Sequence, residues 1–249
     1  MDVDIIWSAA RLIAWGLRPQ ARPAQEPEYS KLVELYFENG QFRNAVRLAA
    51  DGLGLTPVEV SAHGIILLPH EDSVFALKPA DFRPGGAKGE ERLLDGLIQI
   101  AIAATVFPRS RDLDEDRDLA RPPITVEEVD ATLRSVCSQL AQQAQAAPDP
   151  KADDSTEGLL ELWRIYASRL PVVETRDGRV SPRSTYSQIK YALEWLRQNG
   201  FFTALTYRGE PAWQPSRRYQ AAVQDLSATR IYGYVEELLS NSAKNEGIS

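Results

Sequence analysis

The sequence predicts a mainly α-helical protein with small β-hairpins, arranged as two winged-helix units in tandem. Apolar residues recur at helical spacing through most of the chain. At two places, paired apolar runs separated by turn residues predict hairpins. Each hairpin follows a group of helices, which is the element order of a winged helix, a helix-turn-helix with a β-wing behind it.

The first 27 residues are predicted to form a separate helical segment, with a helix from Ile5 to Leu17. This segment begins with acidic residues, Arg11 interrupts its apolar run, and it is shorter than the about 20 residues that a bilayer span requires. We therefore expect neither a targeting signal nor a membrane partner. An amphipathic helix buries one face, and packing on its own chain is favoured over packing on a partner.

The first winged-helix unit, with its bridging helices, is predicted over residues 28–147. A helix capped by Ser30 is expected to stop at Gly40, and a second helix in "QFRNAVRLAADGLG" is expected to end at Gly52. Thr56 is expected to cap a third helix, with Pro57 in its first turn.

The winged-helix part of this unit ends near residue 85 with a predicted hairpin. In "GIILLPHEDSVFAL", two apolar runs flank the turn sequence "PHED". The stretch 93–107 is apolar on nearly every side and predicts a central buried helix. A capping box of Thr125 and Glu128 then starts a further helix. One apolar stripe of that helix comprises Val129, Leu133, Val136 and Leu140.

A small, acidic, proline-containing linker is predicted over residues 148–156, and a second winged-helix unit over 157–240. An amphipathic helix opens this unit, and a second helix follows Ser184 and ends at Gly200. A hairpin and a last helix capped by Ser216 come next.

The second unit has no clear middle helix. That helix would have to fit within "TRDGRVSPR", so it is either a single turn or absent from a degenerate copy. Residues 241–249 are expected to form a flexible tail.

The charge of the chain is unevenly distributed. The 249 residues contain 28 basic and 35 acidic side chains, for a net charge of −7. Between Thr175 and Arg230, however, nine basic residues face four acidic ones, so this segment carries +5. Basic side chains, hydroxyls and a helix N-terminus are the groups that contact a phosphate backbone. The predicted DNA-binding residues are Arg176, Arg179, Arg183, Ser184, Thr185, Lys190, Arg208, Arg217 and Arg218. The alternative is that these arginines form a solvated face or pair with the acidic first half of the chain.

The residue types that carry catalysis or bind metals are sparse. The two histidines, His63 and His70, are interpreted as exposed residues of a hairpin turn. The single cysteine, Cys137, is expected to be a small buried residue, and it allows neither an intrachain disulfide nor a cysteine-based zinc site. We therefore expect no catalytic residue, no metal site and no cofactor, and a cytoplasmic, nucleoid-associated location.

The order of three blocks resembles the kite family, the kleisin-interacting tandem winged-helix subunits of SMC complexes of the MukE, MksE and Wadjet type. The blocks are "LVELYFENGQFRNAVRLAADGLGL", "RLLDGLIQIAIAATVFP" and "STYSQIKYALEWLRQNGFFTAL" with "AWQPSRRYQAAV". The resemblance is architectural and covers most of residues 28–240. It implies a non-catalytic homodimeric adaptor that binds a kleisin-like subunit, serves an SMC-like ATPase and contacts duplex DNA, in chromosome organisation or plasmid defence.

Two other function classes stay open. A winged-helix transcriptional regulator would protect one specific DNA site, whereas an adaptor would bind DNA with strong salt dependence and no preferred sequence. A metal-dependent nuclease would require carboxylates such as Asp114 or Asp116, which lie in the acidic run "DLDEDRD".

Overall fold

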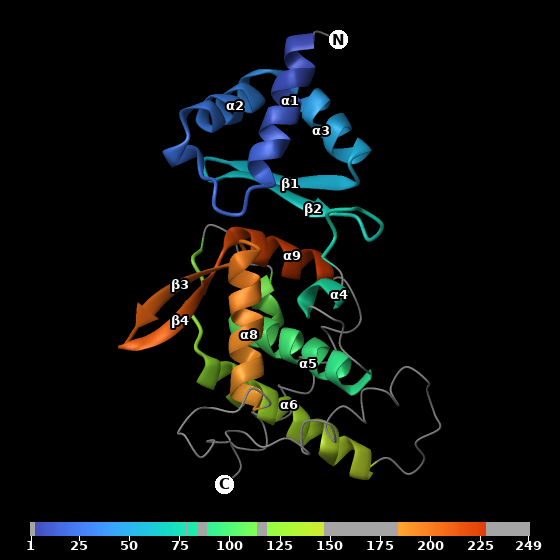
Figure 1. Ribbon diagram of the computed structural model, residues 1–249, viewed down its shortest axis with the longest axis vertical. Coiled ribbons are helices and arrows are strands. Elements are labelled where there is room, and N and C mark those ends of the chain that lie inside the picture. Colours follow the sequence, from blue (N-terminus) through green and yellow to red (C-terminus); the bar gives the residue numbers. More distant parts are fainter. Residues whose placement is uncertain (1–2, 78, 84–88, 114–118, 147–183, 228–249) are drawn as a thin grey trace.

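The computed structural model describes residues 3–77, 79–83, 89–113, 119–146 and 184–227. These residues are mainly helical, with two small antiparallel hairpins, which confirms the coarse fold class predicted from the sequence. Figure 1 shows two lobes, one above the other. Each lobe has its own cluster of buried apolar side chains.

The N-terminal lobe comprises three helices over one hairpin (Figure 1). Its elements are α1 (Val3–Gly16), the 3₁₀ helix η1 (Pro23–Gln25), α2 (Pro27–Glu38), α3 (Gly40–Gly52), β1 (Leu55–Ser61) and β2 (Gly64–Pro69). Helix α1 is part of this lobe, because its buried Leu12 and Ile13 share one apolar cluster with Phe42 of α3 and Leu67 of β2. The amphipathic N-terminal helix thus packs on its own chain, as predicted.

Local capping differs from the prediction at α2. The helix begins at Pro27 rather than after Ser30, because proline lacks the N–H that a first-turn residue would leave unpaired. It ends at Glu38, and Asn39 caps α3 by accepting hydrogen bonds from the backbone N–H groups of Gln41 and Phe42.

The predicted third helix at Thr56 is wrong, because this stretch is β1. It pairs with β2 in antiparallel register, Leu55 opposite Pro69 and Ser61 opposite Gly64. The register shifts between Pro57 and Glu59, and such an irregularity accommodates a proline that has no N–H to give to the ladder.

The first hairpin consequently turns at Ala62 and His63, and not at "PHED" as predicted. Gly64 closes this turn with a φ of 114°. Residues 73–77, expected to be the second strand, instead belong to a loop that is held by backbone hydrogen bonds from Ser73 N to His70 O and from Ala76 N to Ser73 O.

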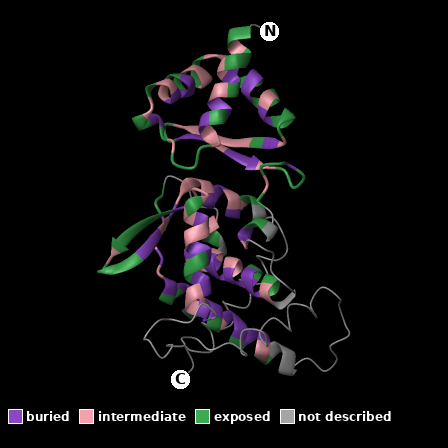
Figure 2. Ribbon diagram, viewed as in Figure 1, coloured by how far each residue is buried: buried purple, intermediate pink, exposed green. Residues whose placement is uncertain are grey.

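The C-terminal lobe contains the second hairpin and the larger core. Its elements are α4 (Pro79–Phe82), α5 (Gly89–Val106), the 3₁₀ helix η2 (Ser110–Leu113), α6 (Val126–Ala146), α8 (Thr185–Gln198), β3 (Phe202–Tyr207), β4 (Glu210–Pro215) and α9 (Arg217–Ser227). Figure 2 shows the buried residues concentrated where α5, α6 and α8 meet.

Several sequence predictions for this lobe are confirmed. The four stripe residues of α6 are all buried, and Thr125 and Glu128 form the predicted reciprocal capping box. Helix α8 buries the predicted face, and its C-terminus is followed by Gly200 at φ 76°. Ser216 caps α9 by accepting a hydrogen bond from the N–H of Tyr219.

One short strand contact ties α6 to the second hairpin. Ile124, just before α6, forms an antiparallel bridge with Trp213 of β4, with N···O distances of 3.0 and 2.9 Å. The bridge places residue 124 at the edge of the β3–β4 hairpin. It therefore attaches α6, and with it α5, to the hairpin that follows α8.

The two lobes meet where α9 packs against β2 (Figure 1). Arg217 of α9 forms an ion pair with Glu59 of β1, with Nη2 2.6 Å from Oε1. Gly200 lies against Pro19, and a Cβ atom at position 200 would be only 2.7 Å from Pro19 Cβ. The predicted linker 148–156, the "TRDGRVSPR" segment and the tail 241–249 lie outside the described residues.

Candidate nucleic-acid interface

The predicted DNA-binding residues do not form one surface. Arg176, Arg179 and Arg183 lie outside the described residues. The other six fall into three pairs with different environments.

Ser184 and Thr185 are buried at the N-terminus of α8, which contradicts their prediction as phosphate contacts. The Ser184 hydroxyl caps α8 by accepting a hydrogen bond from the Ser187 N–H at 3.2 Å. The Thr185 hydroxyl lies 3.3 Å from Asp130 of α6 and donates to its carboxylate. The Ser184 hydroxyl caps the helix, and the Thr185 hydroxyl forms a hydrogen bond between α8 and α6. Neither hydroxyl is therefore available to a phosphate.

Arg217 and Arg218 are also removed from the predicted DNA surface. Arg217 forms the ion pair with Glu59 between the lobes. The Arg218 guanidinium lies over the ring of Phe201, 5.0 Å from its centroid, and burial lowers the pKa of this group. Both side chains therefore stabilise packing within the protein. For Arg217 this is the alternative of pairing with the acidic first half of the chain. The sequence could not identify Glu59 or Phe201 as the partners, because each is distant in the chain or comes from another element.

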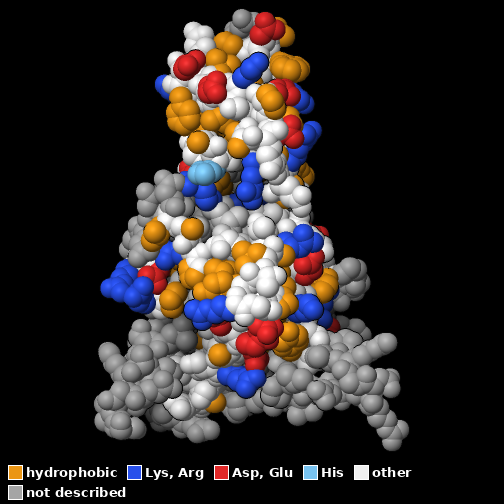
Figure 3. Space-filling model, turned by 90° about the vertical axis from the view of Figure 1, so that its left-hand side faces the viewer, with side chains coloured by type: hydrophobic (Ala, Val, Ile, Leu, Met, Phe, Trp, Pro, Cys, Tyr) orange, Lys and Arg blue, Asp and Glu red, His pale blue; other side chains and the backbone are white. Residues whose placement is uncertain are grey.

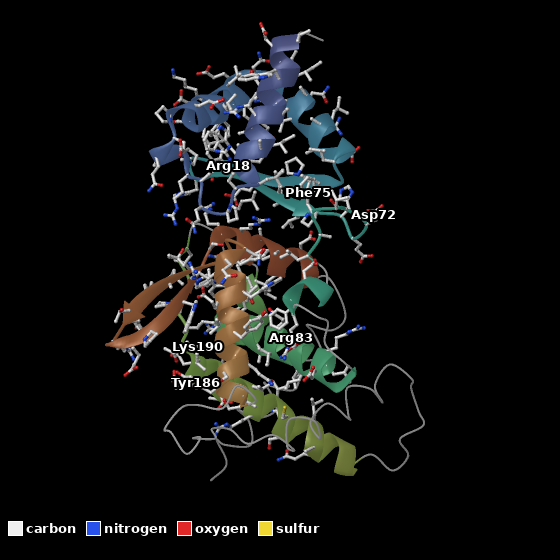
Figure 4. All side chains as sticks on the ribbon, in the orientation of Figure 1. Arg18, Asp72, Phe75, Arg83, Tyr186 and Lys190 are labelled. Carbon is white, nitrogen blue, oxygen red and sulfur yellow. The ribbon has the colours of Figure 1, made fainter. Side chains whose placement is uncertain are left out.

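Lys190 and Arg208 remain exposed. Lys190 lies on α8, on the side that Figure 4 shows turned toward the β3–β4 hairpin, with Tyr186 one turn earlier. Arg208 lies at the tip of that hairpin with a φ of 52°, and its guanidinium stacks 5.0 Å from the Tyr207 ring centroid. We call these four residues, Tyr186, Lys190, Tyr207 and Arg208, the α8–hairpin face.

The hairpin itself projects from the C-terminal lobe (Figure 1). Four consecutive residues of β3, from Thr203 to Thr206, are exposed, so both faces of the strand are accessible. A projecting two-stranded ribbon with a basic tip can lie along a nucleic-acid backbone.

The electrostatics of this face are mixed. Burial is the largest effect that raises the pKa of the Tyr186 phenol, and the carboxylates of Glu127 and Glu210 raise it further. Glu194 on α8 is paired with Arg197 at 2.6 Å, which lowers the pKa of Glu194. Figure 3 shows this side of the molecule, where Lys and Arg side chains are scattered among acidic and hydrophobic ones. The arrangement supports a few phosphate contacts rather than a broad basic patch.

Helix α3 has an exposed polar face that was not predicted from the sequence. Gln41, Asn44 and Arg47 are exposed at helical spacing, opposite the buried Phe42, and Arg47 donates a hydrogen bond to Asn44 at 3.1 Å. Arg43 is engaged elsewhere, because it donates to the carbonyl oxygens at the end of α2. Arginine, asparagine and glutamine are the residues that most often read base edges in a major groove. A helical wheel of "GQFRNAVRLAADG" would have revealed this face.

The structure describes no arrangement that points to catalysis. Among the described residues, no three His, Cys, Asp or Glu side chains are grouped as metal ligands. The ring of His70 hydrogen-bonds with Thr56 at 2.9 Å, and Asp114 and Asp116 lie outside the described residues. In the described part of the chain, no helix has the length and apolar character needed to cross a bilayer.

Cys137 provides a test of the core. It is buried in α6, as predicted, and burial raises the pKa of its thiol to about 12. We expect the native protein to resist Ellman's reagent at about pH 8, near the pKa of an exposed thiol, and to react fully once unfolded. Since the folded-state pKa lies above the ordinary value of 9.0, the free energy of unfolding should fall as the pH rises from 9 toward 12. Rapid labelling of the folded chain would contradict this placement, and Cys137→Ser provides the blank.

Comparison of the chain with protein-family models, with curated proteins and with solved structures gave no match.

Proposed function

We propose that this chain is a non-catalytic adaptor with two winged-helix units that contacts duplex DNA without reading its sequence. As in the kite subunits that it resembles, its partners would be a kleisin-like subunit, an SMC-like ATPase and a second copy of itself. The observation that carries the proposal is the bridge between Ile124 and Trp213.

The bridge supports a complete winged helix in the C-terminal lobe. A winged helix has three helices and a wing, and a short strand after the first helix commonly pairs with the wing. Here the order is α5, the single bridged residue 124, α6, α8 and the β3–β4 hairpin. In this interpretation α6 is the middle helix that had no clear counterpart in the sequence, and the second unit begins at α5 rather than at residue 157.

The N-terminal lobe supports the first unit in the same way. Helices α1, α2 and α3 precede the β1–β2 hairpin, so α1 takes the place of the first helix. The ion pair between Arg217 and Glu59 joins the two units and supports their action as one body. Exposed apolar residues on α1, Val3, Ile6 and Trp7, suit a contact with a second copy or with the kleisin-like partner.

The DNA contact is assigned to the α8–hairpin face. In the double variant Lys190→Glu and Arg208→Glu, affinity for a random-sequence duplex is expected to fall about tenfold or more, because two cations that replace counterions become anions. The slope of log K against log salt concentration should become less negative by about 0.9 for each phosphate that the variant no longer neutralises. Fluorescence anisotropy between about 50 and 200 mM salt measures this slope.

A matched control separates this interaction from a change in net charge. Arg22 and Lys31 are exposed on the N-terminal lobe, and Arg22→Glu with Lys31→Glu makes the same charge change. This control should bind DNA nearly as well as the unaltered chain. An equal loss in both double variants would remove the α8–hairpin face from the proposal.

The exposed face of α3 favours one second candidate, a transcriptional regulator. Asn44→Ala with Arg47→Ala should then abolish a footprint at one operator and leave binding to random DNA intact. An adaptor would show no footprint at all. Purification of the chain from its native host should bring down an SMC-like ATPase and a kleisin-like protein, which would support the adaptor function. Their absence from the purified material would count against it.

A further inference from the structure

An exposed apolar patch lies at the C-terminal end of α3, away from the α8–hairpin face. It combines Leu53, which follows α3, with three residues of the loop after β2. The exposed fractions are 45% for Leu53, 87% for Val74, 37% for Phe75 and 43% for Leu77. Solvent-exposed large apolar side chains that gather in this way mark sites of association. We call these four residues the loop patch.

The loop is held in place rather than left free. Ser73 is 5% exposed, and its hydroxyl donates to the Leu53 carbonyl oxygen and accepts from the Phe75 N–H, both at 3.2 Å. His70 N donates to Gly54 O at 2.8 Å. Gly54 has a φ of 67°, and a Cβ atom there would lie 3.1 Å from Ser73 Cβ. These contacts fix Val74 and Phe75 beside Leu53, so the patch is preorganised.

The rim of the loop patch is acidic. Asp51 at the end of α3 and Glu71 and Asp72 in the loop are all exposed, and Figure 4 labels Asp72 and Phe75 in this loop. The sequence from 48 to 77 contains no Lys or Arg at all. The remaining acid of this stretch, Glu59, is paired with Arg217. Arg47 and Lys78 flank this stretch, and among its described residues the charge beside the apolar side chains is negative.

We propose that the loop patch docks a cationic amphipathic helix of a partner protein. The apolar side chains suit the apolar face of a helix, and the three carboxylates suit lysines or arginines that flank it. An added strand is disfavoured, because the N–H groups of Ser73, Phe75 and Ala76 are already bonded within the loop. An anionic membrane is disfavoured by the acidic rim. The proposal does not depend on DNA binding or on the adaptor function.

The test uses the full chain and a fluorescent synthetic peptide that forms a helix with leucine on one face and lysine on the other. The unaltered protein should bind this peptide at least about tenfold more tightly than a peptide in which glutamate replaces lysine. Asp51→Lys with Asp72→Lys should reverse that preference. Val74→Ser should weaken binding of the lysine peptide without changing the melting temperature, because Val74 is almost fully exposed.

Two controls distinguish a docking site from general attraction. Glu34→Lys with Glu38→Lys makes the same charge change on the exposed surface of α2, and Phe37→Ser removes apolar surface from the same helix, where Phe37 is 54% exposed. Both should leave peptide binding unchanged. An equal loss in either control would overturn the proposal. A sedimentation coefficient of the free Val74→Ser protein that differs from that of the unaltered protein would also overturn the proposal. It would show that a second copy of the chain covers the patch.

Discussion

Gly64→Ala is expected to destabilise the N-terminal lobe by about 4 kcal/mol, from backbone strain of about 1–3 kcal/mol and loss of a buried hydrogen bond of about 1–3 kcal/mol. Gly64 has a φ of 114°, where a side chain is strained, and its added Cβ would lie 2.1 Å from the hydroxyl of Tyr29. That hydroxyl accepts a hydrogen bond from Ile65 N at 2.8 Å in the core. The alanine must therefore displace a buried ring.

A second hairpin glycine gives the matched control. Gly209 has a φ of 87°, but a Cβ atom added at this position would have no atom within 4 Å beyond its immediate chain neighbours. Gly209→Ala should then introduce only the strain, about 1 kcal/mol. Urea unfolding followed by tryptophan fluorescence measures both. Tyr29→Phe removes the clashing oxygen, so its combination with Gly64→Ala should destabilise less than the sum of the two changes. Equal effects at the two glycines would contradict this explanation.

Arg217→Glu is expected to weaken the packing of the two lobes by about 2–4 kcal/mol, because it leaves Glu59 partly buried beside a second carboxylate. The side chains of Arg217 and Glu59 are only 21% and 15% exposed, and their atoms approach to 2.6 Å. In guanidinium unfolding, the single transition should separate into two, one for each lobe. Any loss of DNA binding in this variant would accompany altered lobe packing, and would not identify a phosphate contact.

Charge exchange tests whether the pair itself is responsible. The double variant Glu59→Arg with Arg217→Glu restores opposite charges and should recover most of the stability. Arg197 and Glu194 form a more exposed pair on α8, with side chains that are 33% and 40% exposed. Arg197→Glu breaks this pair and should change the free energy of unfolding by less than about 1 kcal/mol. Failure of the exchanged pair to recover stability would show that packing around α9, rather than the ion pair, joins the lobes.

Features that depend on neighbours within one or two turns of a helix were predictable from the sequence. The capping box of Thr125 and Glu128, the buried stripe of α6 and the stop at Gly200 all follow from residue spacing. The start of α2 at Pro27 is a local signal that the prediction overlooked, whereas the larger failures involve partners far along the chain. Thr56 and Pro57 resemble a helix start, but pairing with β2 makes them a strand.

The candidate site shows the same division. Residue type alone made Arg217, Arg218, Ser184 and Thr185 equivalent to Lys190 and Arg208 as candidates for phosphate contact. Burial separates them, and burial depends on which elements pack together. The sequence by itself determined most of the helices, their apolar faces and the uneven charge, because these follow from local spacing and composition. Only the tertiary structure decided which strands pair, that Arg217 joins the lobes, and which cations reach solvent, because each depends on contacts between residues distant in the chain.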